Sequence, residues 1–314
     1  MLKTFLLIVV GLTGDPEHAK TFQQWGLKLA EASTRLGVPP ERLVFLMDKP
    51  AEGVKNVTGA PTSEEIGMAF ERFAKEAGPE DVIFVTLIGH GSFSDRTAKF
   101  NLPGRDMSAP DFNAMLRKLP TKQIVFVNTT SSSGPFVEEL SGPGRTIVTA
   151  TRNGAEQYAT LFGGFFVDAL TSDTADADKN KRVSILEAFN FAKAEVARAY
   201  EKQGLLATEH ALLDDNGDKE GSQAPGVAGK DGKVSPDGKV AGILSFGAAS
   251  AGLPSDPKLR ALYQERLDLE RQMENLRLMK DGMPAAKYQA ELERLATALA
   301  LKAREIRALE GQKP

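Results

Sequence analysis

Short, uninterrupted apolar runs recur along the first half of the chain, and amphipathic stretches separate them. The runs are rich in Val, Ile, Leu and Phe and lack polar alternation, so each predicts a strand that is buried on both faces. We expect strands at Leu6–Val10, Arg42–Met47, the run that starts at Val82, Gln123–Asn128 and Arg145–Ala150, with a last strand at Val240–Phe246.

The stretches between these runs have helical spacing. Glu17–Leu36 carries its apolar residues on one stripe, and Glu156–Leu170 predicts a further helix. Thr62-x-x-Glu65 and Ser108-x-x-Asp111 have the spacing of capping boxes, which open helices. Buried strands that alternate with helices are typical of a mostly parallel sheet covered on both faces. We therefore predict an α/β fold.

The composition changes towards the C-terminus. Gly221–Gly238 is too poor in apolar residues to bury itself, so we expect a mobile loop. From Asp256 onwards, leucines and isoleucines at three- and four-residue spacing predict two long helices, and Asp281–Pro284 separates them. The expected organisation is an α/β domain over 1–250 and a helical hairpin over 256–314. The hairpin can pack on the α/β domain, on a second copy or on another protein.

Composition and charge exclude several classes of protein. With 39 Lys+Arg against 42 Asp+Glu the formal net charge is −3, and no basic patch alternates with aromatics, so we expect no nucleic-acid partner. The chain has no cysteine, which excludes disulfides and a thiolate nucleophile. No apolar run reaches the roughly 20 residues that cross a bilayer. Met1–Thr13 resembles a signal peptide, but it lacks a cleavage site and predicts a first strand instead.

Candidate chemistry follows two of the predicted strands. The run from Val82 ends in Gly89-His90-Gly91, and Gln123–Asn128 is followed by a cluster of threonines and serines that ends at Gly134. Parallel strands present their carboxyl ends at one edge of the sheet, where ligands bind in open α/β folds. We therefore expect His90 and a serine at one edge of the sheet. The alternative is that these residues only shape a turn and have no role in chemistry.

The order of these motifs resembles the legumain-like branch of the caspase-type cysteine peptidases. In that family a strand-end His-Gly precedes an Ala-Cys-x-Ser-Gly segment and then a strand that ends in Thr-Ala before a turn with a glutamate. Here the corresponding stretches are Gly-His-Gly-Ser, Thr129–Gly134 and Thr146–Glu156, within a layout that covers about residues 4–247. The resemblance implies that His90 is the base, that the Gly91 N–H belongs to the oxyanion hole, and that Ser131 takes the place of the nucleophilic cysteine.

A serine at this place changes the functional expectation, because a hydroxyl needs much stronger activation than a thiol. The leading interpretation is a catalytically impaired peptidase homologue that binds or scaffolds a peptide or protein. One alternative is an active peptidase or acyl hydrolase with Ser131 as nucleophile and His90 as base. Another is an unrelated doubly wound ligand-binding protein, although no Gly-rich phosphate motif follows a strand. An engineered Cys→Ser replacement also accounts for Ser131. The resemblance favours an exported protein.

One further segment has the spacing of an EF-hand calcium loop. Oxygen-bearing side chains occupy loop positions 1, 3, 5, 9 and 12, position 7 supplies a backbone carbonyl, and Lys181 stands at position 6, where glycine is usual. A polar turn between two helices accounts equally for this pattern. Leu213–Ser222 is a second acidic loop, which we expect to be a solvated turn. The predicted calcium ligands are Asp176, Asp178, Asn180, Arg182, Ser184 and Glu187.

Overall fold

The structure is a computed structural model that describes residues 3–48, 56–177, 179, 182–226, 235–246, 256–278 and 283–310. The chain divides into two compact units. The first comprises Met1–Thr34 and Val38–Phe246, and the second comprises Arg35–Gly37 and Gly247–Pro314. The predicted domains differ from these units in detail, and independent folding of 1–250 and 256–314 stays a prediction.

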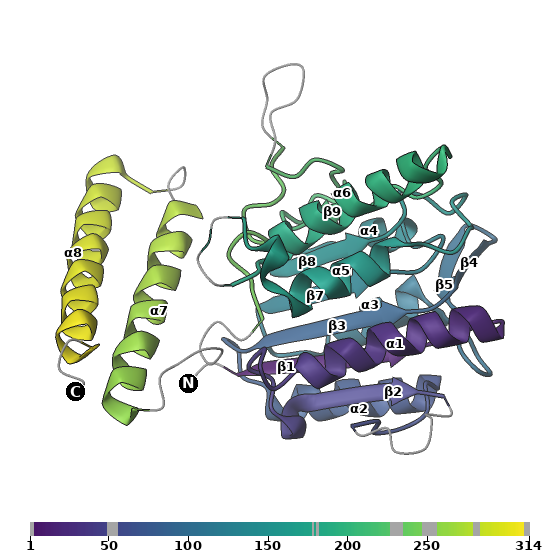
Figure 1. The fold of residues 1–314 in the computed structure, drawn as a ribbon, viewed down its shortest axis with the longest axis horizontal. Helices are drawn as coiled ribbons and strands as arrows, with labels where there is room; N and C mark the ends of the chain where they lie inside the picture. Colours follow the sequence, from purple (N-terminus) through teal and green to yellow (C-terminus); the bar gives the residue numbers. More distant parts are fainter. Residues whose placement is uncertain are drawn as a thin grey trace. The chain divides into compact units, whose positions relative to one another are not determined.

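A six-stranded sheet forms the centre of the first unit, in the order β2-β1-β3-β7-β8-β9 (Figure 1). The first five strands in this order are parallel, and β9 runs antiparallel to β8 at the edge. The mostly parallel α/β fold that the sequence predicts is therefore confirmed. The strands are β1 (Thr4–Val10), β2 (Leu43–Met47), β3 (Val82–Ile88), β7 (Gln123–Asn128), β8 (Arg145–Thr149) and β9 (Leu212–Asp214).

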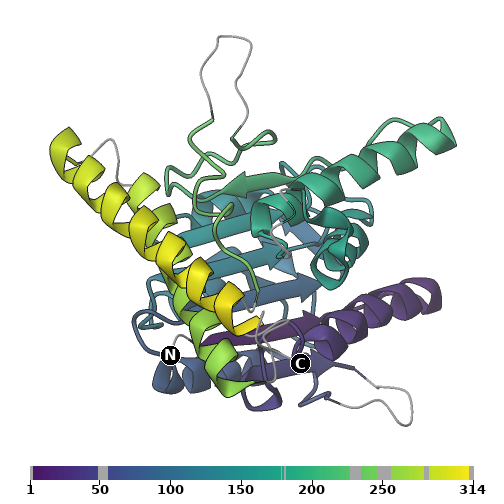
Figure 2. The same cartoon turned by 60° about the vertical axis from the view of Figure 1, so that its left-hand side comes forward.

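Helices cover both faces of this sheet, as Figures 1 and 2 show. Helices α1 (Pro16–Ala32), α5 (Phe162–Thr171) and α6 (Ile185–Gln203) lie on one face. The other face carries α2 (Ser63–Glu76), α3 (Ala109–Leu116) and α4 (Pro135–Leu140). Because both faces are covered, β1 and β3 are buried along their whole length. Two short 3-10 helices, Pro40–Arg42 and Asp173–Ala175, complete the helices of this unit.

Helix starts follow the polar signals in the sequence. The Thr62 hydroxyl accepts a hydrogen bond from the Glu65 N–H, and Ser108 with Asp111 forms a complete capping box. At the start of α1 the Asp15 carboxylate accepts hydrogen bonds from the N–H groups of Glu17 and His18. These side chains satisfy N–H groups that have no partner inside their helices, so they fix where each helix begins.

Two predicted elements differ from the structure, and one strand was not predicted. Helix α5 begins at Phe162 and not at Glu156, because Glu156 is held in the preceding loop. The Val240–Phe246 run does not form a strand. It is a turn, of which Ser245 alone makes a bridge, to Ser184, and its Phe246 ring stacks on Phe84 with ring centroids 3.8 Å apart. The last strand of the sheet is instead the three-residue β9, which is too short for a sequence pattern.

A second, three-stranded antiparallel sheet follows β3 directly, and the sequence gives no clear pattern for it. It contains β4 (Gly91–Ser94), β5 (Thr97–Phe100) and β6 (Met107–Ser108). Asp95 and Arg96 at its tight turn both have positive φ angles. Gly221–Gly238 is described at 221–226 and 235–238, and the remaining part of the predicted mobile loop, 227–234, lies outside the described ranges.

The second unit contains α7 (Pro257–Leu278) and α8 (Ala285–Glu310), which pack against each other. The predicted helical hairpin is therefore confirmed as a pair of helices. The Lys302 ammonium of α8 lies 2.6 Å from the Glu265 carboxylate of α7. Within the described ranges of both units, none of the helices combines the length and apolar character that crossing a membrane requires.

Two glycines in helix interiors give a matched test of this packing. A Cβ on Gly26 of α1 would lie 2.6 Å from the Val10 side chain of β1, whereas one on Gly67 of α2 would meet nothing within 4 Å. We expect Gly26→Ala to lower the free energy of unfolding by about 1–3 kcal/mol through overpacking. Gly67→Ala is expected to raise it by about 0.5–1 kcal/mol, because alanine favours helix. Urea titrations would measure both, and equal effects would contradict the close approach of α1.

Removal of Asp256–Pro314 tests whether the α/β unit folds alone. This cut retains Phe246 and its stack on Phe84. We expect the truncated chain to keep its near-ultraviolet circular dichroism and a single cooperative thermal transition, because the sheet and its six α-helices already enclose a core. Aggregation on size-exclusion chromatography would show instead that the hairpin covers apolar surface of the unit.

Candidate functional site

The predicted site lies at the carboxyl edge of the sheet, where β3 and β7 run side by side. Their parallel register pairs Leu87 with Asn128, so the segments that follow the two strands leave the sheet at the same level. His90 follows β3 and is half-buried, and Ser131 follows β7 with 2% of its surface exposed. The fold thus places both predicted residues at one edge.

The His90 ring is held by the loop that follows β1. Its Nε2 atom lies 3.1 Å from the backbone carbonyl oxygen of Thr13. A carbonyl can only accept a hydrogen bond, so this contact assigns a proton to Nε2. In the neutral ring, Nδ1 is then the atom with the free lone pair. Thr13 therefore orients His90 and sets its tautomer without any carboxylate.

Two aromatic side chains of α1 lie against the His90 ring. The ring centroids of His18 and Phe22 lie 4.9 Å and 5.1 Å from that of His90. Burial lowers the pKa of His90 below its ordinary value near 6.5, and electrostatic repulsion from the nearby His18 ring lowers it further. The Thr13 carbonyl and the Asp15 carboxylate act in the opposite direction but are weaker. His90 is consequently a neutral imidazole at pH 7.

The Ser131 hydroxyl makes both of its hydrogen bonds with Gly91. Its Oγ accepts from the Gly91 N–H at 3.2 Å and donates to the Gly91 carbonyl oxygen at 3.0 Å. No hydrogen bond joins Ser131 to the His90 ring, both of which the structure describes. A Cβ on residue 91 would lie 2.2 Å from the Ser131 carbonyl oxygen, so only glycine permits this approach.

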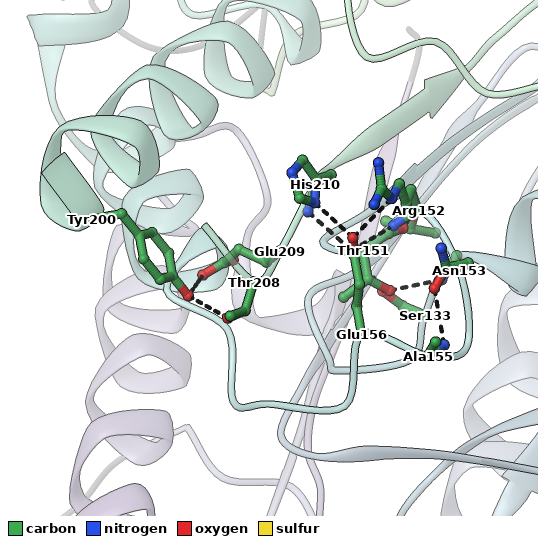
Figure 3. Close-up of polar contacts among 12 residues, drawn as sticks. Ser133, Thr151, Arg152, Asn153, Ala155, Glu156, Tyr200, Thr208, Glu209 and His210 are labelled. Carbon is green, nitrogen blue, oxygen red and sulfur yellow. Dashed lines mark hydrogen bonds and ion pairs between the residues drawn. The ribbon is translucent and has the colours of Figure 1, made fainter. Parts of the chain in front are cut away.

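The turn that carries Ser131 is strained and is supported by the loop between β8 and α5. Ser132 has a φ of 55°, in the left-handed region that serine rarely adopts. Its N–H donates to the Glu156 carbonyl oxygen at 2.7 Å, and its hydroxyl donates to the Gly154 carbonyl oxygen at 3.0 Å. Thr151 and Ser133 add hydroxyl and backbone contacts at the base of the turn (Figure 3). The surrounding loop therefore holds the strained conformation in place.

The Glu156 carboxylate fixes that loop, as Figure 3 shows. It accepts hydrogen bonds from the Arg152 N–H at 3.0 Å and the His210 N–H at 3.1 Å. It also pairs with the Arg152 Nε atom at 3.0 Å and the His210 Nδ1 atom at 2.6 Å. This largely buried carboxylate therefore has four donors. Through them Glu156 connects the segment before β9 to the loop that supports the turn with Ser131.

The neighbouring Glu209 serves the start of α5. Its carboxylate accepts hydrogen bonds from the N–H groups of Leu161 and Phe162 at 2.8 Å and 3.0 Å. Burial raises the pKa of Glu209, and these two hydrogen bonds act against that rise. Tyr200 and Thr208 share a hydrogen bond beside it (Figure 3). Glu209 therefore anchors α5 at the same edge where Glu156 anchors the preceding loop.

The sequence and the structure agree on the place of the site and differ in its contacts. Gly91 and Ser131 are brought together, whereas the His90 ring is bonded to Thr13. The roles of His90, Gly91 and Ser131 in catalysis stay predictions. Sequence analysis missed the Thr13 carbonyl and the pair of Glu156 with His210. A backbone acceptor has no sequence signal, and no pattern links two residues that lie so far apart in the chain.

The predicted calcium loop is described only in part. Asp178 and Asn180 lie outside the described residues. Glu187 and Ser184 form a capping box at the start of α6, with Glu187 Oε2 2.8 Å from the Ser184 N–H. Among the residues that the structure describes, no group of three or more His, Asp or Glu side chains is placed to hold a metal ion. Calcium binding by this loop, including Asp176 and Arg182, stays a prediction.

Comparison with known proteins supports the resemblance in outline. Residues 63–213 match the family model described as the Peptidase C13 family. This match supports a peptidase-related protein of the legumain and caspase-like class. A crystal structure of protein GSU0716 from Geobacter sulfurreducens is similar with a TM-score of 0.44 and 14% identity, over 68% of this chain and 92% of that chain. No curated protein matches the chain.

Histidine titration by NMR tests the environment of His90, because the chain has only three histidines. We expect the His90 ring to titrate below its ordinary pKa of 6.5, and His18→Gln to raise that pKa by removing the electrostatic repulsion from the neighbouring ring. His210→Gln is the control and should leave the His90 titration unchanged. Titration of His90 at or above 6.5 in the wild-type protein would contradict the burial described above.

Proposed function

We propose that this chain is a catalytically impaired relative of the legumain and caspase-like peptidases, and that it uses the carboxyl edge of its sheet to bind a peptide or a protein. The match to the Peptidase C13 family supports the relation to peptidases. The contacts of Ser131 support the loss of turnover. The residues exposed around the edge support binding.

The contact that carries this proposal is the pair of hydrogen bonds between Ser131 and Gly91. A nucleophilic hydroxyl must transfer its proton to a base during attack. The Ser131 proton is donated to the Gly91 carbonyl oxygen, which cannot act as that base. The Gly91 N–H, which the resemblance assigns to the oxyanion hole, is also occupied by the Ser131 oxygen. Reaction would require both contacts to break.

The chemistry of serine adds to this barrier. A thiol is partly ionised near neutral pH, whereas a hydroxyl is not and must lose its proton in the transition state. Each 1.36 kcal/mol added to the barrier slows the reaction tenfold. A family site built around a thiolate therefore loses most of its rate when serine replaces cysteine, unless a base is held in direct contact with the hydroxyl.

Exposed apolar side chains gather on loops at the same edge. Leu12 follows β1 with 46% of its surface exposed, and Tyr158 follows β8 with 73% exposed. Phe93 in β4 and Leu161 before α5 are each 36% exposed. All four follow the carboxyl ends of strands, next to the segments that carry His90 and Ser131. Exposed apolar groups on the segments that flank a site are available for contact with a partner.

An active serine hydrolase is the second candidate, and one observation favours it. The Thr13 carbonyl fixes His90 with Nε2 protonated, which leaves Nδ1 free to accept a proton. Catalytic hydrogen bonds are often loose until substrate binds. In this candidate mechanism the Ser131 hydroxyl rotates away from Gly91 and donates its proton to the His90 ring.

A fluorophosphonate probe and a mixed peptide library distinguish the two candidates. We expect the wild-type protein to resist labelling and to leave the library uncleaved, because the Ser131 proton is not directed to a base. Mass spectrometry of the intact protein and of the peptides would measure both. Labelling of Ser131 that requires His90, together with peptide cleavage that Ser131→Ala abolishes, would instead establish a serine hydrolase.

Ser131→Cys extends this experiment to the assignment of the site. If His90 is the base of the site, iodoacetamide should alkylate the thiol at residue 131 several-fold faster than in the double variant with His90→Ala. Ser94→Cys is a matched control, because residue 94 is exposed on β4 and its thiol should not respond to His90→Ala. Equal rates with and without the imidazole would count against His90 as the base.

A further inference from the structure

A group of buried carboxylates lies away from the site described above. Strand β9 runs antiparallel to β8, with Leu212 opposite Thr149 and Asp214 opposite Ile147. Asp214 therefore lies towards the amino end of β8, whereas His90 and Ser131 are at the carboxyl edge of the sheet. The turn after β9 packs on the segment before β8, where the Lys219 N–H donates to the Ser141 hydroxyl at 3.0 Å.

The turn is exposed at Asn216 and from Asp218 to Glu220, as its polar sequence predicts, but the two aspartates that open it are buried. Asp214 is 0% exposed and Asp215 is 7% exposed. Asp237 lies in the next described range, 235–246, and is 1% exposed. Three acidic side chains are thus buried together, and aspartate is seldom buried without a partner.

The three carboxylates differ in the number of hydrogen bonds that they accept. Asp215 is satisfied, because its two oxygens accept hydrogen bonds from the Gly238 N–H at 2.9 Å and the Ala241 N–H at 2.7 Å. Asp237 accepts one hydrogen bond, from the Asp215 N–H at 3.3 Å. Asp214 Oδ1 accepts one from the Gly217 N–H at 3.0 Å. The second oxygen of Asp214, Oδ2, is buried and has no hydrogen-bond partner among the residues that the structure describes.

Within the described ranges, no ion pair compensates the charge of this group. Burial is the main cause that raises the pKa of Asp237 to about 7, and the carboxylates of Asp214, Asp215 and Asp218 raise it further. Asp237 lies beside the start of the turn, because its carboxylate accepts the hydrogen bond from the N–H of Asp215, the residue that follows Asp214. In the described part of the chain no lysine or arginine forms an ion pair with the three buried aspartates. Such a group needs a positive charge.

We propose that Asp214 and Asp237 bind a divalent cation, and specifically Ca²⁺, at the turn that follows β9. Calcium accepts six to eight oxygen ligands in irregular geometry, including backbone carbonyls and water, whereas Mg²⁺ requires a near-ideal octahedron. No three acidic or histidine side chains in the described ranges are arranged around one metal position, so the proposed site needs backbone carbonyls or water as further ligands. The unpartnered Asp214 oxygen is the first ligand of the proposed site.

Thermal unfolding of the full chain tests this site. At pH 7.5 and pH 8.5, a concentration of Ca²⁺ about a hundredfold above Kd should raise Tm by about 5 °C or more relative to EDTA, because the ion binds only the folded protein. Mg²⁺ at the same concentration should have a smaller effect. Asp214→Asn and Asp237→Asn should each abolish the rise. Asp237→Asn should also raise Tm in EDTA, since it removes a buried like charge, so its loss of response is not a failure to fold.

Two control variants separate this site from other sources of a calcium effect. Glu220→Gln changes an exposed carboxylate on the same turn and should retain the full rise in Tm. Asp176→Asn changes the predicted EF-hand-like loop and should retain the rise as well. A rise that Asp176→Asn abolishes and Asp237→Asn preserves would overturn the proposal, as would equal Tm values in Ca²⁺ and EDTA at both pH values.

Discussion

The contact between the Gly91 backbone and the turn that carries Ser131 is the constraint on which the candidate site depends. Parallel pairing of β3 and β7 brings the two segments to the same edge, and the absence of a side chain at Gly91 lets them approach. The same approach lets the Ser131 hydroxyl bond to both polar groups of the Gly91 backbone. The feature that assembles the site therefore also holds the Ser131 hydroxyl on the Gly91 backbone, and the proposed loss of turnover rests on this contact.

The strained turn at Ser132 persists because the neighbouring loop between β8 and α5 holds it in place. Its N–H and hydroxyl are satisfied by carbonyl groups of the loop between β8 and α5. That loop is in turn fixed by Glu156, whose carboxylate binds Arg152 and His210. Backbone strain of about 1–3 kcal/mol is sustained only where the surroundings determine the conformation in this way. The polar pair is thus part of the support for the site, although it lies outside the predicted residues.

Buried carboxylates have different hydrogen-bond and ion-pair partners at the two ends of the sheet. At the carboxyl edge, the Glu156 carboxylate has cationic and N–H donors for its oxygens. At the other end, Asp214 keeps a buried oxygen without a donor beside two more acidic groups. A buried carboxylate without donors is unstable unless a proton or a cation neutralises it. This contrast is what distinguishes a structural ion pair from a candidate cation site.

The sequence by itself determined the α/β class, the parallel strands, the starts of α2 and α3, the terminal helix pair and the edge that carries His90 and Ser131. These follow from local patterns, namely apolar runs, helical spacing and capping residues, which act over a few residues. Only the tertiary structure decided that Thr13 orients His90, that Ser131 is bonded to Gly91, that His210 reaches Glu156, and that Asp214 is buried. Each of these contacts joins residues that are distant in the chain or involves backbone atoms, and neither kind leaves a pattern in the order of side chains.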